Sequence, residues 1–168
     1  MTITANSAFH NANNFTISMF IKPDVLGSDD MFFTLGSSTT AKFDFRFLDS
    51  SGNLRFVVYA ANGDFSSGNA DAQSSGQVLN TTDYWHIVGV FDNDNNSQKI
   101  YINATERASK TPTIDSNTAS ANLIIGNRSG GSLHFDGHIG QVKFFSKALS
   151  ASEVTAEYDA NKATYGLS

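Results

Sequence analysis

The carboxylates are the first residues to test for chemistry in this chain. It contains only three glutamates, Glu106, Glu153 and Glu157, while its aspartates are scattered, mostly among turn-forming residues. Hydrolysis of a glycosidic bond with retention needs two carboxyl groups held about 5 Å apart. Glu106 falls in a stretch expected to be a loop, and the other two fall in a short helix near the C-terminus. No catalytic residue is predicted, and we expect a protein that is not an enzyme.

The histidines do not change this expectation. None of the four has an evident carboxylate partner, and no Gly-x-Ser-x-Gly motif supplies a nucleophile. His134, Asp136 and His138 alternate along the chain and could suggest a metal site. However, Asp136 is followed by Gly137, which favours a bulge or bend between the two histidines. No metal-ligating residue is therefore assigned.

Calcium needs separate consideration because Asp92, Asp94 and Asn96 place oxygens at alternate positions. This resembles the first half of a calcium-binding loop. The sixth position is Ser97 where such loops need glycine, and the twelfth is Asn103 where they need glutamate. A solvated hairpin tip explains the loop more simply. We therefore expect no cofactor and keep calcium as the alternative.

The remaining candidate is a binding face on two neighbouring strands. Alternate apolar residues of segments 43–47 and 54–58 predict one buried face, so the residues between them point outward. An aromatic ring among planar hydrogen-bonding groups suits the face of a sugar. The simpler alternative is a surface ion pair between Asp44 and Arg46 or Arg55. The candidate ligand-binding residues are Asp44, Arg46, Arg55 and Tyr59, with Asn62, Asp64 and Asp71 from the following segment.

A long hairpin is the element around which these residues must be arranged. Residues 84–91 and 98–103 are rich in β-branched and aromatic residues, and the six residues between them are all polar. The first strand is apolar on both faces, with Ile87 and Phe91 on one side and Val88 and Val90 on the other. Such a strand belongs in the interior of a sheet that is covered on both sides.

Further strands are indicated by alternation and by apolar runs. Segment 15–21 alternates and predicts a half-buried strand that ends at Pro23. Two polar stretches, 60–76 and 104–121, are expected to be loops. The other predicted strands are 31–35, 42–48, 54–59, 123–126 and 138–145.

The C-terminal segment predicts a helix that starts at a capping box. Ser150 is the expected N-cap, and Glu153 stands at the third helical position. Leu149 and Val154 form the matching hydrophobic staple, and the helix should end near Lys162. A helix this short is expected to pack against the rim or back of the sheets. The prediction is an all-β, two-sheet antiparallel β-sandwich with one short C-terminal helix, formed by residues 1–168 as a single domain.

Composition narrows the choice of partners. The net charge is −5 with 11 Lys and Arg and no basic run, so nucleic acid is not an expected partner. No apolar run approaches the roughly 20 residues that span a bilayer, so membrane insertion is not expected. The chain has no cysteine, and its first residues lack the pattern of a signal peptide. A virion surface or an extracellular setting is compatible with these features.

Several motifs together resemble the laminin-G-like jelly roll of the concanavalin A-like lectin and glucanase superfamily. The resemblance runs in the family's order from Phe15 onward and covers nearly the whole chain. It implies two antiparallel sheets that bind ligands on a concave face or at one loop rim. The matching segments are Phe15–Asp24, Trp85–Asp92, Ile100–Asn103, Leu123–Asn127, Phe135–Val142 and Ala148–Val154.

Three departures from the family pattern carry consequences. Gly140-Gln141 stands where relatives have Asp-Glu, so the acidic ligands of a structural calcium are missing. Asn103-Ala104 replaces the usual Asn-Gly turn. The chain begins just after the place of the family's opening strand, which predicts an open sheet edge. The Glu-x-Asp-x-x-Glu strand of the superfamily's glucanases is absent as well.

Two functions from different classes follow from these observations. The first is a non-catalytic module that binds carbohydrate, such as a cell-surface glycan. The alternative is a structural or assembly protein, such as a virion decoration or fibre domain, that uses the lectin fold for protein–protein contacts. Both are compatible with a homo-oligomer or a protein partner at the open edge.

Overall fold

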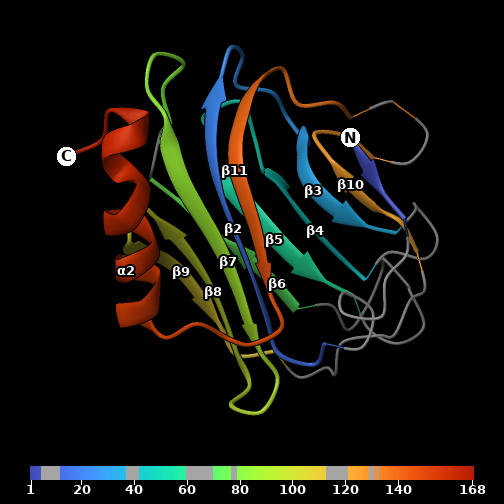
Figure 1. Ribbon diagram of the computed structural model, residues 1–168. Helices are drawn as coiled ribbons and strands as arrows, with labels where there is room; N and C mark the ends of the chain where they lie inside the picture. Colours follow the sequence, from blue (N-terminus) through green and yellow to red (C-terminus); the bar gives the residue numbers. More distant parts are fainter. Residues whose placement is uncertain are drawn as a thin grey trace.

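The computed structural model describes residues 1–4, 12–36, 42–59, 70–76, 79–112, 121–128, 131 and 133–168. Two antiparallel sheets stack face to face and form a β-sandwich, as the sequence predicted (Figure 1). The six-stranded sheet has the order β1-β10-β3-β4-β5-β6, and the five-stranded sheet has the order β11-β2-β7-β8-β9.

The strands of the six-stranded sheet are short and those of the five-stranded sheet are longer. The first comprises β1 (Thr2–Ile3), β3 (Met31–Leu35), β4 (Phe43–Phe47), β5 (Leu54–Val58), β6 (Ala70–Gln73) and β10 (Leu123–Ile125). The second comprises β2 (Phe15–Pro23), β7 (Trp85–Asp92), β8 (Ser97–Ile102), β9 (Thr105–Lys110) and β11 (Gly137–Phe145). Helix α2 (Ala151–Asn161) follows and continues into the 3₁₀ turn η1 (Lys162–Tyr165).

Aromatic rings fill the space between the sheets. The ring of Phe15 on β2 lies 4.8 Å from that of Phe43 on β4 and 5.5 Å from that of Phe91 on β7. Phe56 on β5 meets the Phe15 ring edge-on at 6.1 Å. These rings come from both sheets, so the phenylalanines predicted to face inward do join the sheets into one core.

Strand β7 is central and covered on both faces, as its apolar residues predicted. Ile87 and Phe91 belong to the core between the sheets. Val88 and Val90 point the other way and pack with the residues that flank the start of α2, Leu149 and Val154. Figure 1 shows α2 lying along the outer side of the five-stranded sheet. The helix therefore packs against the back of a sheet.

The predicted helix start is confirmed. Ser150 is the N-cap, its side chain accepts a hydrogen bond from the Glu153 backbone N–H, and the Glu153 side chain accepts one from the Ser150 backbone. Leu149 is 6% exposed and Val154 is fully buried in the same cluster. This helix is short, and in the described part of the chain no helix has the length and apolar character needed to cross a membrane.

Three expectations about secondary structure were wrong. The stretch 60–76 contains β6, and the stretch 104–121 contains β9, which places Glu106 on an edge strand instead of in a loop. Both strands are polar because each lies at the edge of its sheet. Strand β2 is buried on both faces, not half-buried, because Thr16 and Ser18 are covered on the helix side.

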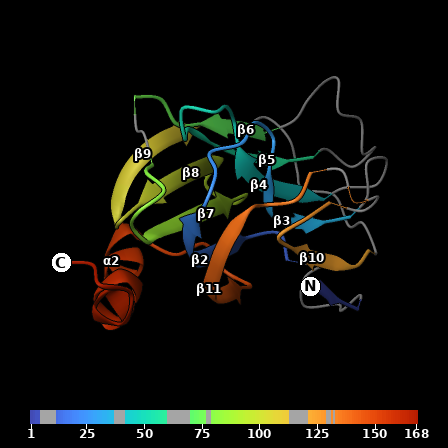
Figure 2. The same cartoon turned by 90° about the horizontal axis from the view of Figure 1, so that it is seen from above.

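The two ends of the sandwich differ. At one end the edge strand β6 lies next to β9 and β8, so the sheets close against each other. At the other end the edges are β11 and β1, and Figure 2 shows these strands diverging. The candidate site lies on the outer side of the six-stranded sheet, and the diverging edges bound a cavity.

Candidate functional site

The outer face of the six-stranded sheet carries the predicted binding residues. Phe43, Phe45 and Phe56 lie in the core, so the residues between them point away from it. Arg46 on β4 pairs in register with Arg55 on β5. The prediction that these side chains share an outward face with Asp44 and Tyr59 is confirmed.

The expectation that all of them are exposed is wrong for Asp44 and Tyr59, which are each 2% exposed. The Tyr59 hydroxyl donates a hydrogen bond to the Asp44 carboxylate. Burial raises the pKa of the Asp44 carboxyl, and Arg46 and Tyr59 oppose that shift. Burial also raises the pKa of the Tyr59 hydroxyl, which keeps its proton for this bond. The pair forms a buried layer beneath the surface, so Tyr59 offers no exposed aromatic platform.

Arg46 links this buried layer to the rim. Its Nε lies 3.4 Å from an Asp29 carboxylate oxygen and 3.6 Å from Asp44 Oδ1, and its side chain is 12% exposed. Thr34 on β3 lies directly opposite Asp44 in register. Apart from these ion pairs, Thr34 Oγ1, Asp44 Oδ1 and Arg46 Nε are buried and make no hydrogen bond with the described residues. These polar atoms therefore lie beneath the surface of the face.

The exposed part of the face is centred on Arg55 and Asp71. The guanidinium donates two hydrogen bonds to the Asp71 carboxylate, at 3.0 Å from Nε and 2.7 Å from Nη2. The two side chains are 28% and 25% exposed. Gln73 Nε2 donates a further hydrogen bond of 2.9 Å to Asp71 Oδ2. These three side chains form a connected array of donors and acceptors at the surface.

Gln73 was missed at the sequence level. Asp71 and Gln73 flank the small buried residue Ala72, an apolar-in, polar-out alternation that marks β6. The signal is only four residues long and stands in a polar stretch, so the sequence alone favours a loop there. Of the other predicted residues, Asn62 and Asp64 lie outside the described part of the chain.

The hairpin tip shows how its carboxylates are used. Asp92 accepts hydrogen bonds from the backbone and side chain of Asn95, and Asp94 accepts one from the Asn14 amide at 2.6 Å. Both carboxylates are therefore engaged within the protein. Among the described residues, no group of three or more acidic or histidine side chains could hold a metal ion. Calcium stays an untested alternative.

A β-sandwich with a helix behind one sheet and a polar array on the outer face of the other is a lectin-like jelly roll. The chain belongs to the concanavalin A-like lectin/glucanases superfamily, whose family model matches residues 1–155. No curated protein matches the sequence.

Solved structures share this fold at low sequence identity. A carbohydrate-binding module of family 40 from the Ruminococcus gnavus IT-sialidase, bound to α2,3-sialyllactose, is similar with a TM-score of 0.73 at 16% identity, over 94% of this chain and 98% of that one. Domain 4 of AbnA, an extracellular arabinanase of Geobacillus stearothermophilus in complex with arabinotriose, has a TM-score of 0.66 at 22% identity, over 92% and 67%. A heptameric pentraxin of Limulus polyphemus has a TM-score of 0.70 at 16% identity, over 96% and 74%.

Proposed function

We propose that this protein is a non-catalytic module that binds carbohydrate on the outer face of its six-stranded sheet. The observation that carries the proposal is the partly exposed Arg55–Asp71 pair with Gln73 beside it. Bidentate pairing fixes the plane of the guanidinium, while Arg55 Nη1 makes no hydrogen bond within the described residues. A fixed donor next to carboxylate and amide oxygens can bind neighbouring sugar hydroxyls.

The buried layer supports the surface array. A side chain that recognises a ligand must be held in place before the ligand arrives, because ordering it on binding costs free energy. Arg55 lies opposite Arg46 on the neighbouring strand, and Arg46 is held by Asp29 and Asp44. The Tyr59 hydrogen bond fixes Asp44 in turn. These contacts hold β4 and β5 in place, and with them the Arg55 side chain of the surface array.

The similar structures favour sugars over other small ligands. Two of the three described above are modules seen with bound saccharides, sialyllactose in one and arabinotriose in the other.

The glutamates support a function without catalysis. Glu106 pairs with Lys99 at 2.8 Å, and Glu157 pairs with Lys143 at 2.7 Å. Glu153 serves the capping box of α2. All three carboxylates thus have a structural role, and none lies on the proposed binding face.

The alternative of a virion decoration or fibre protein receives no support from the structures described above. A homo-oligomer and an extracellular or virion-surface setting likewise stay expectations. A contact with another polypeptide is favoured by one separate observation, the cavity at the open end of the sandwich.

A glycan array followed by calorimetry on the strongest hit tests the proposal. We expect a saccharide to bind and Arg55→Ala to weaken it at least tenfold. Arg55→Lys should weaken it nearly as much, because an ammonium cannot form the bidentate pair. The matched control is Lys99→Ala, which removes a surface cation with an acidic partner from the other sheet. The proposal would be contradicted if no glycan on the array bound, or if the Arg55 and Lys99 variants bound with equal affinity.

A further inference from the structure

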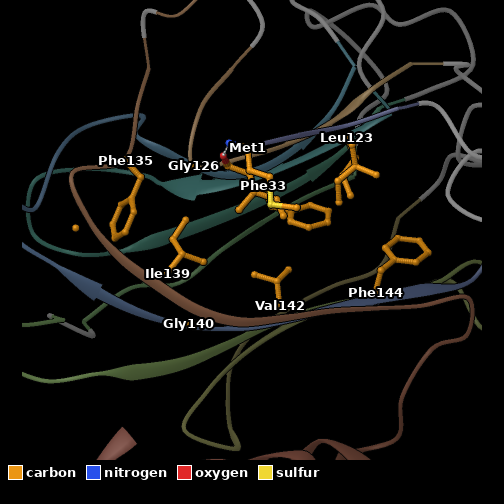
Figure 3. A pocket seen from close by; sticks show the side chains of 12 residues that line it. Met1, Phe33, Leu123, Gly126, Phe135, Ile139, Gly140, Val142 and Phe144 are labelled. Carbon is orange, nitrogen blue, oxygen red and sulfur yellow. Dashed lines mark hydrogen bonds between the residues drawn. The ribbon is translucent and has the colours of Figure 1, made fainter.

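An apolar cavity of about 710 Å³ opens between the two diverging edges of the sandwich. One wall is β11, and the other is built from β1, β10 and β3. Figure 3 shows Ile139, Val142 and Phe144 on the β11 side facing Phe33 and Leu123 on the opposite sheet. Packed protein interiors leave few voids larger than a water molecule. A space of this size is in the range of binding sites, about 300–1,000 Å³, and is not a packing defect.

The lining of the cavity is apolar. Its twelve residues carry no charged side chain, and three of them are glycines. The one charged group is the N-terminal ammonium of Met1, which donates a hydrogen bond to the Ile125 carbonyl at 2.9 Å. Water in such a space finds few hydrogen-bond partners, so an apolar occupant is favoured over solvent. The lining residues are Met1, Ile3, Phe33, Leu123, Ile125, Gly126, Phe135, Gly137, Ile139, Gly140, Val142 and Phe144.

The backbone of β11 presents hydrogen-bonding groups at the mouth of this cavity. The Asp24 N–H donates to the Asp136 carbonyl at 3.0 Å. This bond determines which opposed residues of β2 and β11 are hydrogen-bonded pairs. In an antiparallel ladder, successive residues turn their N–H and C=O groups to opposite sides. His138 opposite Lys22 therefore bonds to β2, and Gly137 and Ile139 turn their backbone groups away from it.

The bulge in β11 does not change which side of the strand these backbone groups face. Ile139 lies opposite Ile21 and Val142 lies opposite Met19, two residues further along β2. Val142 therefore also turns its backbone groups outward. In the described part of the chain, no backbone hydrogen bond outside the strand ladders involves Ile139 or Val142. The residues whose side chains enter the cavity are thus the residues with outward-facing N–H and C=O groups.

We propose that this open end receives an extended segment of another polypeptide, which pairs antiparallel with β11 and inserts apolar side chains into the cavity. In an antiparallel pair, a residue directly opposite Ile139 exchanges both hydrogen bonds with it and projects its side chain to the same face. One strand with apolar residues at every second position therefore forms hydrogen bonds with the edge of β11 and also fills the cavity.

Other occupants satisfy only one of these two features. A small apolar molecule fills the cavity and leaves the edge of β11 unpaired. A second copy that paired through its own β11 would cover the edge, but its Ile139 and Val142 already face its own cavity. Only a separate strand with free apolar side chains uses both.

The test uses a synthetic peptide of about eight residues in which Val and Thr alternate, acetylated and amidated at its ends. Titration into the whole chain, followed by amide NMR and calorimetry, should show binding with shifts at Ile139 and Val142. In an antiparallel pair, the Val residues carry both the inward side chains and the N–H groups that face β11. N-methylation of every Val should therefore abolish binding, and N-methylation of every Thr should leave it unchanged.

Two variants locate the binding site. Val142→Trp fills the cavity and should weaken the peptide at least tenfold. His138→Trp adds the same ring on the same strand but outside the cavity lining, and should bind like the original protein. If Val142→Trp fails to fold, Val142→Phe serves the same purpose.

Three results would overturn the proposal. One is no peptide binding at millimolar concentration. Another is equal binding of the two N-methylated peptides, which would indicate apolar partition without strand pairing. The third is a dimer in sedimentation that protects β11 and excludes the peptide, which would assign the edge to a second copy.

Discussion

The imidazole of His86 lies against the hydroxyl of Ser18 on the neighbouring strand, with His86 Nε2 and Ser18 Oγ 2.8 Å apart. The pair is buried between the five-stranded sheet and the C-terminal segment, and the ring of Phe20 stacks on His86 at a centroid distance of 4.5 Å. Burial, aided by the charge of Lys143, lowers the pKa of His86 to about 4. His86 is therefore a neutral packing residue of the native state.

The first prediction concerns acid stability. The His86 pKa is lower in the folded protein than its usual 6.5. Between pH 6.5 and 4, His86 therefore binds a proton in the unfolded chain but not in the native state. Stability should fall through this window, by up to about 3 kcal/mol from this group. Urea unfolding at pH 7 and pH 4.5 measures this change. The free energy of unfolding should fall less between these pH values for His86→Gln than for the original protein.

The control for that experiment is His138→Gln, since the His138 side chain is 65% exposed. It should retain the full loss of stability on acidification. An equal loss for His86→Gln and the original protein would show that His86 does not carry the effect.

The second prediction concerns the turn between β8 and β9. Both of its central residues have positive φ, 47° at Asn103 and 60° at Ala104. This is a conformation in which a residue with a Cβ is strained, and glycine is the residue that favours it. We expect Ala104→Gly to raise the free energy of unfolding by about 1 kcal/mol.

Ala108→Gly in the following strand, β9, is the matched control, because Ala108 does not have a positive φ. It should lower stability by about 0.5–1 kcal/mol. Thermal or urea unfolding measures both changes, and a loss of stability for Ala104→Gly would refute the turn argument.

The third prediction concerns the buried layer beneath the binding face. Tyr59→Phe removes the hydroxyl that donates to the buried Asp44 carboxylate. Losing this buried hydrogen bond should cost about 1–3 kcal/mol of unfolding free energy. The same substitution in an Asp44→Asn background should cost less, since the carboxyl acceptor is then gone. Additive losses in this double-mutant cycle would show that the two side chains are not coupled.

The fourth prediction concerns Gly89 at the centre of β7. A Cβ at this position would lie 3.0 Å from two atoms of the Phe56 ring. That ring is held between Phe15 and Phe45, so it has no room to retreat. Gly89→Ala should therefore destabilise the protein by about 1–3 kcal/mol. Restoration of stability by a second change, Phe56→Leu, would confirm the contact, and a neutral Gly89→Ala would exclude it.

The sequence alone predicted the features that depend on short-range periodicity. The alternation around Phe43, Phe45 and Phe56 places one face of β4 and β5 in the core, because side chains in a strand alternate whatever lies beyond it. The apolar residues on both faces of β7 required a second covering layer, and α2 supplies it. The capping box at Ser150 is a purely local arrangement of hydrogen bonds, and it was predicted residue by residue.

Only the tertiary structure decided the features that depend on what comes to lie across a surface. Edge strands such as β6 and β9 are polar, so their sequences resemble loops until a neighbouring strand pairs with them. The burial of Asp44 and Tyr59 could not be read from alternation, which assigns a face but not what covers it. The cavity exists because β11 and β1 diverge, and the distance between the edges of two sheets is a long-range property that no local pattern encodes.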